Sequence, residues 1–323
     1  MIEVCCYGEA LIDFHGTATG AAPAFTAHPG GAPANVAVAV ARLGGHAAFV
    51  GMFGRDMFGD LLLEGLAAAG VDTRHARRTG AANTALAFVS NAAGGERSFS
   101  FYRPPSADLL FRDADFDPAM FASNCIFHAG SCSMTEPPAA DATLHGMACA
   151  RAAGALVSFD VNLRPALWPR GADPATTIRR ALALADFVKL SVEELAFLAE
   201  ATGSESAALD ALWQAHATLV IVTDSARALR WFTPDAQGTH APRRVRAIDS
   251  TGAGDAFVGG CLYRFASDGI TRTTLEAFAA DGARRDALLS FAAACGALAV
   301  TRTGSFAAMP TLAEVQAFLD QHP

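Results

Sequence analysis

Short apolar runs alternate with longer stretches of helical period along most of the chain. The runs are rich in valine, isoleucine and phenylalanine, and they predict strands at residues 3–7, 47–51, 125–129, 156–160, 187–190 and 219–223. The helical stretches lie at residues 34–43, 59–69, 137–152, 174–185, 192–202, 206–215, 255–266, 273–280 and 284–299. Strands that alternate with helices are typical of repeated strand–helix–strand units. The sequence therefore predicts an α/β fold, with a doubly wound, mainly parallel sheet flanked by helices on both faces.

Two stretches depart from this rhythm. Residues 14–29 are small, polar and turn-rich, whereas residues 84–90 and 98–102 alternate apolar and polar positions around a turn at 91–95. Such alternation predicts a hairpin. Its apolar face must be buried elsewhere, and ligands of open α/β sheets bind at the carboxyl ends of the strands. We therefore predict one domain, residues 1–323, with a small β-strand lid over those ends formed by about 13–34 and 80–104.

Composition limits the classes of function. The 323 residues carry a net charge of −8 and 52% apolar side chains, which is typical of a globular protein with a large core. The acidic balance and the scattered arginine pairs argue against a nucleic-acid partner. The longest uncharged apolar run, 287–301, is shorter than the roughly 20 residues that cross a bilayer. With no basic signal-like start and seven cysteines without a Cys-x-x-Cys pair, we expect a cytoplasmic protein with free thiols and no membrane partner.

Lysine is almost missing from the chain, and this restricts the kind of phosphate site. Lys189 is the only lysine among the 24 basic residues, and it is followed by Leu190, so no Walker A loop is present. A Rossmann fingerprint is also absent, because Phe257 stands where its third glycine belongs. The His-Arg-Asp and Asp-Phe-Gly motifs of protein kinases do not occur either.

Residues 248–260 form the most informative segment. Gly252 and Gly254 flank Ala253 directly before a predicted helix, so that backbone N–H groups can converge on an anion at the helix N-terminus. Asp255 follows them. An acid beside an anion site fits a base that takes a proton from an attacking hydroxyl. The alternative is an acid that the helix dipole favours at an N-terminus.

A second glycine cluster precedes the first predicted helix. Gly30 and Gly31 allow a backbone to approach a ligand closely, and Asn35 can both donate to and accept from hydroxyl groups. Asp13 adds a carboxylate just after the first strand. A plain turn with an asparagine helix cap is the alternative interpretation.

With the segments 30–35 and 249–255 in this order, the chain resembles the PfkB (ribokinase-like) family of carbohydrate kinases along nearly its whole length. Residues 8–14, 101–108 and 159–168 make it most similar to the fructokinases of that family. The resemblance implies a ribokinase-like fold. It also implies transfer of the γ-phosphoryl group of ATP to a primary sugar hydroxyl, giving fructose 6-phosphate from D-fructose.

The resemblance implies a set of site residues as well. The catalytic group would be Asp255 as the base, with Gly252, Ala253, Gly254 and Arg164 around the phosphoryl group. The sugar would contact Asp13, Gly30, Gly31, Asn35, Tyr102, Arg103 and Asp255. The nucleotide would contact Lys189, Ser191, Thr223, Ser225, Gly252 and Gly254. Glu194 would organise Mg²⁺ through water, and Asp249, Thr251 and the segment near Gly304 are candidates for a K⁺ site.

Other substrates and one other class of function stay open. Ser225 and Ala228 replace two family glycines and Ala293 replaces a common asparagine, so the nucleotide preference is not fixed. A 2-keto-3-deoxygluconate kinase, a ribokinase or a nucleoside kinase are alternatives, the first because Arg103 can pair with a carboxylate. A non-catalytic sugar- or nucleotide-binding regulator is the alternative of another class. An apolar lid face favours a homodimer.

Overall fold

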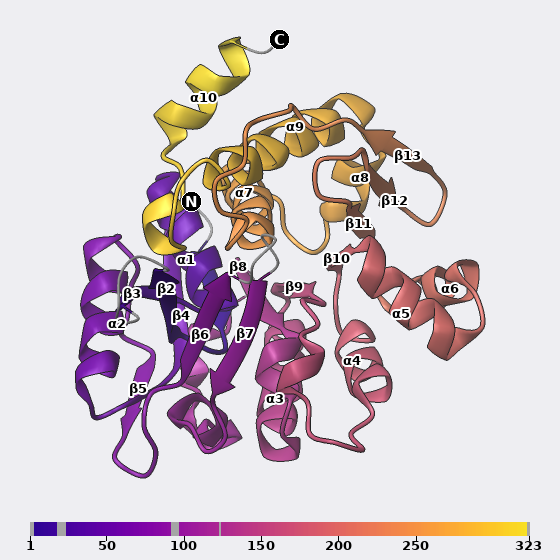
Figure 1. The fold of residues 1–323 in the computed structure, drawn as a ribbon. Coiled ribbons are helices and arrows are strands. Elements are labelled where there is room, and N and C mark those ends of the chain that lie inside the picture. Colours follow the sequence, from indigo (N-terminus) through magenta and orange to yellow (C-terminus); the bar gives the residue numbers. More distant parts are fainter. Residues whose placement is uncertain (1–2, 18–23, 92–96, 123, 322–323) are drawn as a thin grey trace.

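A computed structural model describes residues 3–17, 24–91, 97–122 and 124–321 of the chain. Within these residues the main sheet has nine strands in the order β13-β12-β11-β10-β9-β8-β1-β4-β5 (Figure 1). Neighbours from β11 to β5 run parallel, and β12 and β13 are antiparallel. The strands are β1 (Glu3–Tyr7), β4 (His46–Gly54), β5 (Ala76–Thr79), β8 (Cys125–Gly130), β9 (Leu156–Asp160), β10 (Phe187–Ser191), β11 (Leu219–Thr223), β12 (Leu229–Phe232) and β13 (Gln237–His240).

Helices cover both faces of this sheet, because alternate side chains of each strand point to opposite sides. In β1, Val4 and Cys6 face one apolar core, and Cys5 and Tyr7 face the other. The first core is covered by α1 (Ala32–Arg42), α2 (Met57–Ala68), α7 (Ala253–Ser267), α8 (Leu275–Ala280), α9 (Gly282–Ala299) and α10 (Leu312–Gln321). The second is covered by α3 (Pro137–Ala152), α4 (Pro174–Leu182), α5 (Val192–Thr202) and α6 (Glu205–Ala215).

A separate four-stranded sheet has the order β3-β2-β6-β7. Its strands are β2 (Leu11–Thr17), β3 (Ala24–Gly30), β6 (Leu86–Asn91) and β7 (Arg97–Tyr102). The hairpin of β6 and β7 confirms the prediction for that stretch. Residues 14–29, although small, polar and turn-rich in sequence, contain most of β2 and β3, within the stretch predicted for the β-strand lid. One face of this sheet is open to solvent, so its strands tolerate the small and polar residues that suggested turns.

The predicted α/β fold with a β lid is thus confirmed, and most predicted elements lie within three residues of their positions. The strands expected at 3–7, 156–160 and 219–223 have those bounds in the structure. The sequence interpretation missed β5, β12, β13 and α10; the three strands have four residues each, and β5 and β13 are the two edge strands of the main sheet. Among the helices of the described residues, none combines the length and apolar character that a membrane span requires.

Candidate active site

A pocket of about 530 Å³ lies between the lid and the carboxyl ends of the parallel strands. It is lined by Glu9, Leu11, Asp13, Gly31, Ala32, Asn35, Phe101, Arg103, Cys132, Asn162, Arg164, Leu167, Lys189, Ser191, Glu194 and residues 250–255. Both glycine segments therefore reach one cavity, although they are far apart in the sequence. Residues of the predicted lid and of the predicted anion turn thus line the same site.

The anion turn begins α7. Gly252 is the N-cap of the helix with φ at +75°, a left-handed conformation that favours glycine. Gly254 lies against Lys189, and a Cβ at this glycine would come within 3.2 Å of the ammonium nitrogen. The backbone can therefore approach a ligand at the positive end of the helix dipole, with a buried cation directly beside it.

Asp255 joins the two glycine segments. Its Oδ2 accepts a hydrogen bond of 2.7 Å from Nδ2 of Asn35, 220 positions away in the sequence. Burial raises the pKa of Asp255 to about 6, against the Asn35 hydrogen bond and the charges of Arg164 and Lys189, which lower it. Oδ1 of Asn35 is buried and has no hydrogen-bond partner among the described residues. A ligand hydroxyl in the pocket can donate to that oxygen and lie next to the carboxylate.

Asp13 is a second buried carboxylate of the pocket, on β2. Burial raises its pKa to about 7, with further contributions from the charges of Asp255 and Asp249. Gly30 is packed against this carboxylate, because a Cβ at Gly30 would clash with Oδ2 of Asp13. Among the described residues the lining includes Gly31 but not Gly30. The role that the structure supports for Gly30 is to leave room for Asp13.

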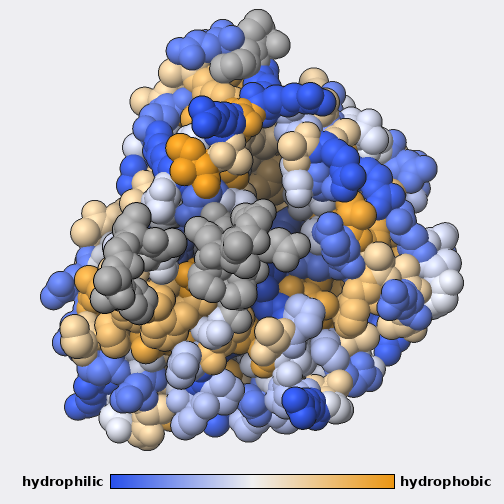
Figure 2. All heavy atoms as spheres, in the orientation of Figure 1, coloured by the Kyte–Doolittle hydropathy of each residue, from blue (hydrophilic) through white to orange (hydrophobic). Residues whose placement is uncertain are grey.

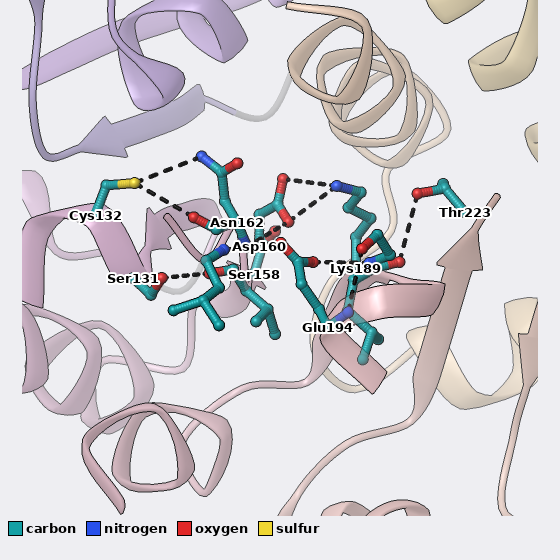
Figure 3. A network of polar contacts seen from close by, with 12 residues as sticks. Ser131, Cys132, Ser158, Asp160, Asn162, Lys189, Glu194 and Thr223 are labelled. Carbon is teal, nitrogen blue, oxygen red and sulfur yellow. Dashed lines mark hydrogen bonds and ion pairs between the residues drawn. The ribbon is translucent and has the colours of Figure 1, made fainter. Parts of the chain in front are cut away.

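Two carboxylates hold the loop that follows β9 and carries Arg164 (Figure 3). Oδ1 of Asp160 accepts from the backbone N–H of Asn162 at 3.2 Å, and Oε1 of Glu194 accepts from the N–H of Leu163 at 2.8 Å. Asn162 has φ at +36°, an uncommon left-handed conformation for a residue other than glycine. These two hydrogen bonds hold the backbone of the loop, and Arg164 of the loop lines the pocket.

Lys189 forms a buried ion pair below this loop. Its Nζ lies 3.1 and 3.2 Å from the two carboxylate oxygens of Asp160 (Figure 3). Burial alone would lower the pKa of Lys189, but the charges of Asp160 and Glu194 outweigh it and raise the pKa above its ordinary value. Lys189 therefore stays an ammonium ion beside the anion turn.

Ser191 and Glu194 form a reciprocal cap at the start of α5. Oε2 of Glu194 accepts from the backbone N–H of Ser191 at 2.7 Å, and Oγ of Ser191 accepts from the N–H of Glu194 at 3.2 Å. Since Leu163 uses the other oxygen, each oxygen of Glu194 already accepts one backbone hydrogen bond. Burial raises the pKa of Glu194. Its remaining lone pairs suit an indirect, water-mediated contact with a cation more than direct ligation.

The remaining predicted nucleotide residues lie next to the pocket rather than in its wall. Among the described residues that line it, Thr223 and Ser225 do not appear. Thr223 lies at the end of β11, where its Oγ1 donates to the carbonyl of Leu190 at 3.5 Å. Ser225 has φ at +49°, so the chain keeps here the left-handed conformation that a glycine favours.

The three residues predicted for a K⁺ site come together beside the anion turn. Oδ1 of Asp249 accepts from the backbone N–H of Thr251 at 2.8 Å, and Oδ2 accepts from the N–H of Gly304 at 3.3 Å. His15 of the lid lies 4.0 Å from Oδ2 of the same carboxylate. In the described ranges, no three His, Cys, Asp or Glu side chains gather as a metal site, and all seven cysteines are free thiols.

The structure corrects the expectation for Tyr102. Successive residues of a strand point to opposite faces, and the two neighbours of Tyr102, Phe101 in β7 and Arg103 directly after it, line the pocket. Tyr102 points to the other face, where it is 67% exposed and packs edge-on against Phe88. The sequence segment 101–108 contains residues that point to both faces of the lid sheet. Only the pairing of the strand determines which of their side chains face the ligand.

Sequence reasoning missed several polar residues that the pocket contains or buries, namely Glu9, Asp108, Cys132, Asp160 and Asn162. Glu9, Asp108, Asp160 and Asn162 lie inside the segments that carry the family resemblance. Glu9 and Asp160 could have been found from the sequence, because each is an acidic residue at the end of a buried strand or shortly after it. Cys132 gives no such signal, since its place depends on how the loop after β8 folds back.

Comparison with known proteins identifies one family, and the relatives described below are named as fructokinases. The family described as pfkB family carbohydrate kinase matches residues 1–312. Fructokinase-1 of Oryza sativa subsp. japonica is 42% identical over 316 residues, which cover 97% of this chain and 96% of the relative. Probable fructokinase-4 of Arabidopsis thaliana is 42% identical over 320 residues, covering 98% and 96%.

Solved structures agree with this. The structure of a fructokinase with bound ATP from Xylella fastidiosa is 52% identical and superposes with a TM-score of 0.95, covering 99% of this chain and 98% of the other. A double mutant of the fructokinase from Vibrio cholerae O395, in a form with fructose, ADP and potassium ion bound, is 36% identical with a TM-score of 0.88. The superposition covers 99% of this chain and 98% of the Vibrio chain.

Proposed function

Since this chain belongs to the pfkB family of carbohydrate kinases, we propose that it is a fructokinase that transfers the γ-phosphoryl group of ATP to O6 of D-fructose. The observation that carries this function is the buried contact between Asn35 and Asp255. It sets a carboxylate, a free amide oxygen and the N-terminus of α7 around one pocket. A phosphoryl acceptor needs all three, because its hydroxyl must be held, deprotonated and directed at a bound phosphate.

Asp255 acts as the base in this proposal. The sugar hydroxyl oxygen forms a bond to the γ-phosphorus, the bond from that phosphorus to the bridging oxygen of ADP breaks, and the hydroxyl proton passes to Asp255. Its pKa of about 6 leaves the carboxylate mostly ionised at neutral pH, yet close enough to pH 7 for efficient proton transfer. The sugar is held by Asp13, Gly31 and Asn35, which all line the pocket.

Charge on the transferred phosphoryl group is neutralised from three sides. The backbone N–H groups of the turn at Gly252, Ala253 and Gly254 point from the N-terminus of α7, and Arg164 and Lys189 supply positive charge. Closure of the lid over the strand ends keeps water from replacing the sugar hydroxyl as the nucleophile.

ATP and cations complete the reaction. ATP is bound in the Xylella relative, and a potassium ion in the Vibrio relative. We assign Lys189, Ser191, Thr223, Ser225, Gly252 and Gly254 to the nucleotide, and Glu194 to a water-mediated contact with Mg²⁺, which would neutralise phosphate charge. Asp249, Thr251 and Gly304 are assigned to K⁺, which is supported by their mutual contacts.

A panel of acceptors with MgATP tests the substrate. We expect kcat/KM for fructose to exceed that for ribose, a nucleoside and 2-keto-3-deoxygluconate by at least about tenfold, a ratio that a few lost hydrogen bonds produce. The measurement is initial rates of ADP release at varied acceptor. Faster turnover of another acceptor would replace the fructose assignment, and sugar binding without any turnover would favour the non-catalytic regulator.

The outer face of the lid supports a homodimer. Phe88 packs against Phe14, Phe25 and Tyr102 with ring centroids 5.0, 5.4 and 5.2 Å apart. Phe25 and Tyr102 are 47% and 67% exposed, and Figure 2 shows hydrophobic residues gathered around the lid strands. An exposed aromatic sheet face on a lid inserted in a single domain is a surface that a second copy can cover by two-fold symmetry.

Charge on this face should therefore break the dimer. We expect the double variant Phe25→Glu and Tyr102→Glu to be a monomer in light scattering, whereas the wild-type chain is a dimer. Met57→Glu is the matched control, because Met57 is 72% exposed but lies on α2, outside the lid. A monomeric wild-type chain, or a dimer that survives both lid charges, would contradict the proposal.

A further inference from the structure

Arg103 is a buried cation in the wall of the sugar pocket. Arg103 is only 2% exposed, and it lines the cavity together with Glu9 and Cys132. A guanidinium in such a position is a natural partner for the carboxylate of an acid substrate, because it offers several donors in one plane. The side chain is also present in a pocket whose proposed substrate, fructose, has no charge. The structure has to explain why this cation does not select a sugar acid.

Two of the three guanidinium nitrogens of Arg103 donate to oxygens of the protein itself. Nε donates to Oδ2 of Asp108 at 2.8 Å, and Nη2 lies 2.6 Å from the same oxygen as an ion pair, but without a hydrogen-bond partner among the described residues. Nη1 donates to the carbonyl oxygen of Cys132 at 2.5 Å. Oδ1 of Asp108 in turn accepts from Oγ of Ser106 at 2.6 Å, which fixes the carboxylate. With the two side chains 2% and 3% exposed, water does not weaken the pair.

A second buried carboxylate lines the same pocket, and its charge acts on the same guanidinium. Glu9 is 3% exposed, and its oxygens accept from Oγ of Ser133 at 2.8 Å and from the backbone N–H of Ala32 at 3.3 Å. Burial alone would lower the pKa of Arg103, but Asp108 and then Glu9 raise it, so the guanidinium is charged. Fully ionised, the three side chains carry one positive and two negative charges.

We propose that Asp108 determines specificity by neutralising Arg103, so that the pocket admits uncharged sugars and excludes sugar acids; this rests on the proposed fructokinase activity. A substrate carboxylate at Arg103 would meet two protein carboxylates and one guanidinium whose charge Asp108 already compensates and whose Nε and Nη1 already donate to protein oxygens. It would lose its hydration and gain at most a hydrogen bond from Nη2 beside two protein carboxylates, which is costly for a buried charge. Discrimination thus comes from a repulsive element built into the wall rather than from a contact with fructose.

Asp108→Asn is the direct test, because it removes the charge and keeps the size of the side chain. We expect the ratio of kcat/KM for 2-keto-3-deoxygluconate to that for fructose to rise at least tenfold. The double variant Asp108→Asn with Arg103→Met should lose this gain, since the guanidinium then no longer attracts the acid. A folded Asp108→Asn enzyme that phosphorylates fructose with an unchanged ratio would overturn the proposal.

A measurement on the wild-type enzyme needs no variant and covers the case in which Asp108→Asn does not fold. D-glucitol and D-gluconate are chains of the same length that differ in a terminal CH₂OH or carboxylate. We expect D-gluconate to inhibit fructose phosphorylation at least tenfold more weakly than D-glucitol. Equal or stronger inhibition by D-gluconate would overturn the proposal.

The outcome also separates this inference from the function on which it rests. Wild-type turnover of fructose is measured first, and a wild-type enzyme that prefers the sugar acid contradicts the proposed function itself. A wild-type enzyme that prefers fructose, combined with D-gluconate inhibition as strong as that of D-glucitol, contradicts only the role of Asp108.

Discussion

The Asp255→Asn variant is expected to lose turnover by a factor of about 10³, within the 10²–10⁴ that a positioned base contributes. An asparagine keeps the size of the side chain and can still accept a hydrogen bond from Asn35, but it cannot take the hydroxyl proton. The loss should therefore appear in kcat, with fructose binding retained in calorimetry. Turnover near the wild-type value would refute the assignment of Asp255 as the base.

The control is another acid in the first turn of a helix. Asp60 occupies this position in α2, is exposed, and forms an ion pair of 2.6 Å with Arg78. If Asp255 served only the helix dipole, Asp60→Asn and Asp255→Asn would behave alike. We expect Asp60→Asn to leave kcat within about twofold of wild type, because the dipole contribution of an exposed acid is below about 1 kcal/mol and acts on stability.

The pH profile gives an independent readout of the same group. Burial raises the pKa of Asp255 to about 6, so the carboxyl becomes protonated as pH falls through 6 and can no longer act as a base. In the wild-type enzyme, protonation of the sugar-binding Asp13 should lower kcat/KM below about pH 7, and protonation of Asp255 should add a second inflection near pH 6. The residual activity of Asp255→Asn should lack this inflection.

Replacing Lys189 with methionine is expected to cause the largest loss of stability. The side chains of Lys189 and Asp160 are 8% and 4% exposed, so the variant would leave a buried carboxylate without its cation. Removing one partner of a buried ion pair costs about 3–5 kcal/mol in the free energy of unfolding. Urea unfolding followed by circular dichroism measures the change.

The partner substitution serves as the control. Asp160→Asn in the Lys189→Met background removes the unpaired charge, so we expect the double variant to regain part of the lost stability. The variant keeps one acceptor for the N–H of Asn162, which holds the loop of Arg164. A single variant within about 1 kcal/mol of wild type would show that the ion pair is dispensable.

The main sheet could be predicted from the sequence because its strands are buried on both faces. Such strands appear as continuous apolar runs, and 219–223 is an example with its bounds correct. The lid could be predicted only in part. Residues 84–90 and 98–102 alternate clearly, but β3, which pairs with the preceding strand β2, contains Pro29 and small polar residues that lower its strand propensity.

The candidate site divides in the same way. Asp255 and Asn35 lie in short motifs, so their residue types and their spacing are enough to indicate chemistry. Asp108 and Asp160 contribute through their ion-pair partners, Arg103 and Lys189. The register of β9 and β10 sets the second pair. The sequence contains a lysine and an aspartate in these strands, but it does not show that they face each other across neighbouring strands.

The contact of Asn35 with Asp255 also has a consequence for the order of events during synthesis. The asparagine belongs to the first helix of the chain, whereas its partner follows 220 residues later. At a translation rate of about 5–20 residues per second, the nascent N-terminal half waits for at least about 11 seconds before the residue that completes the site exists. Until then the sugar-binding residues of the N-terminal half lack the base, Asp255. A truncated chain can therefore form sheet structure but cannot phosphorylate fructose.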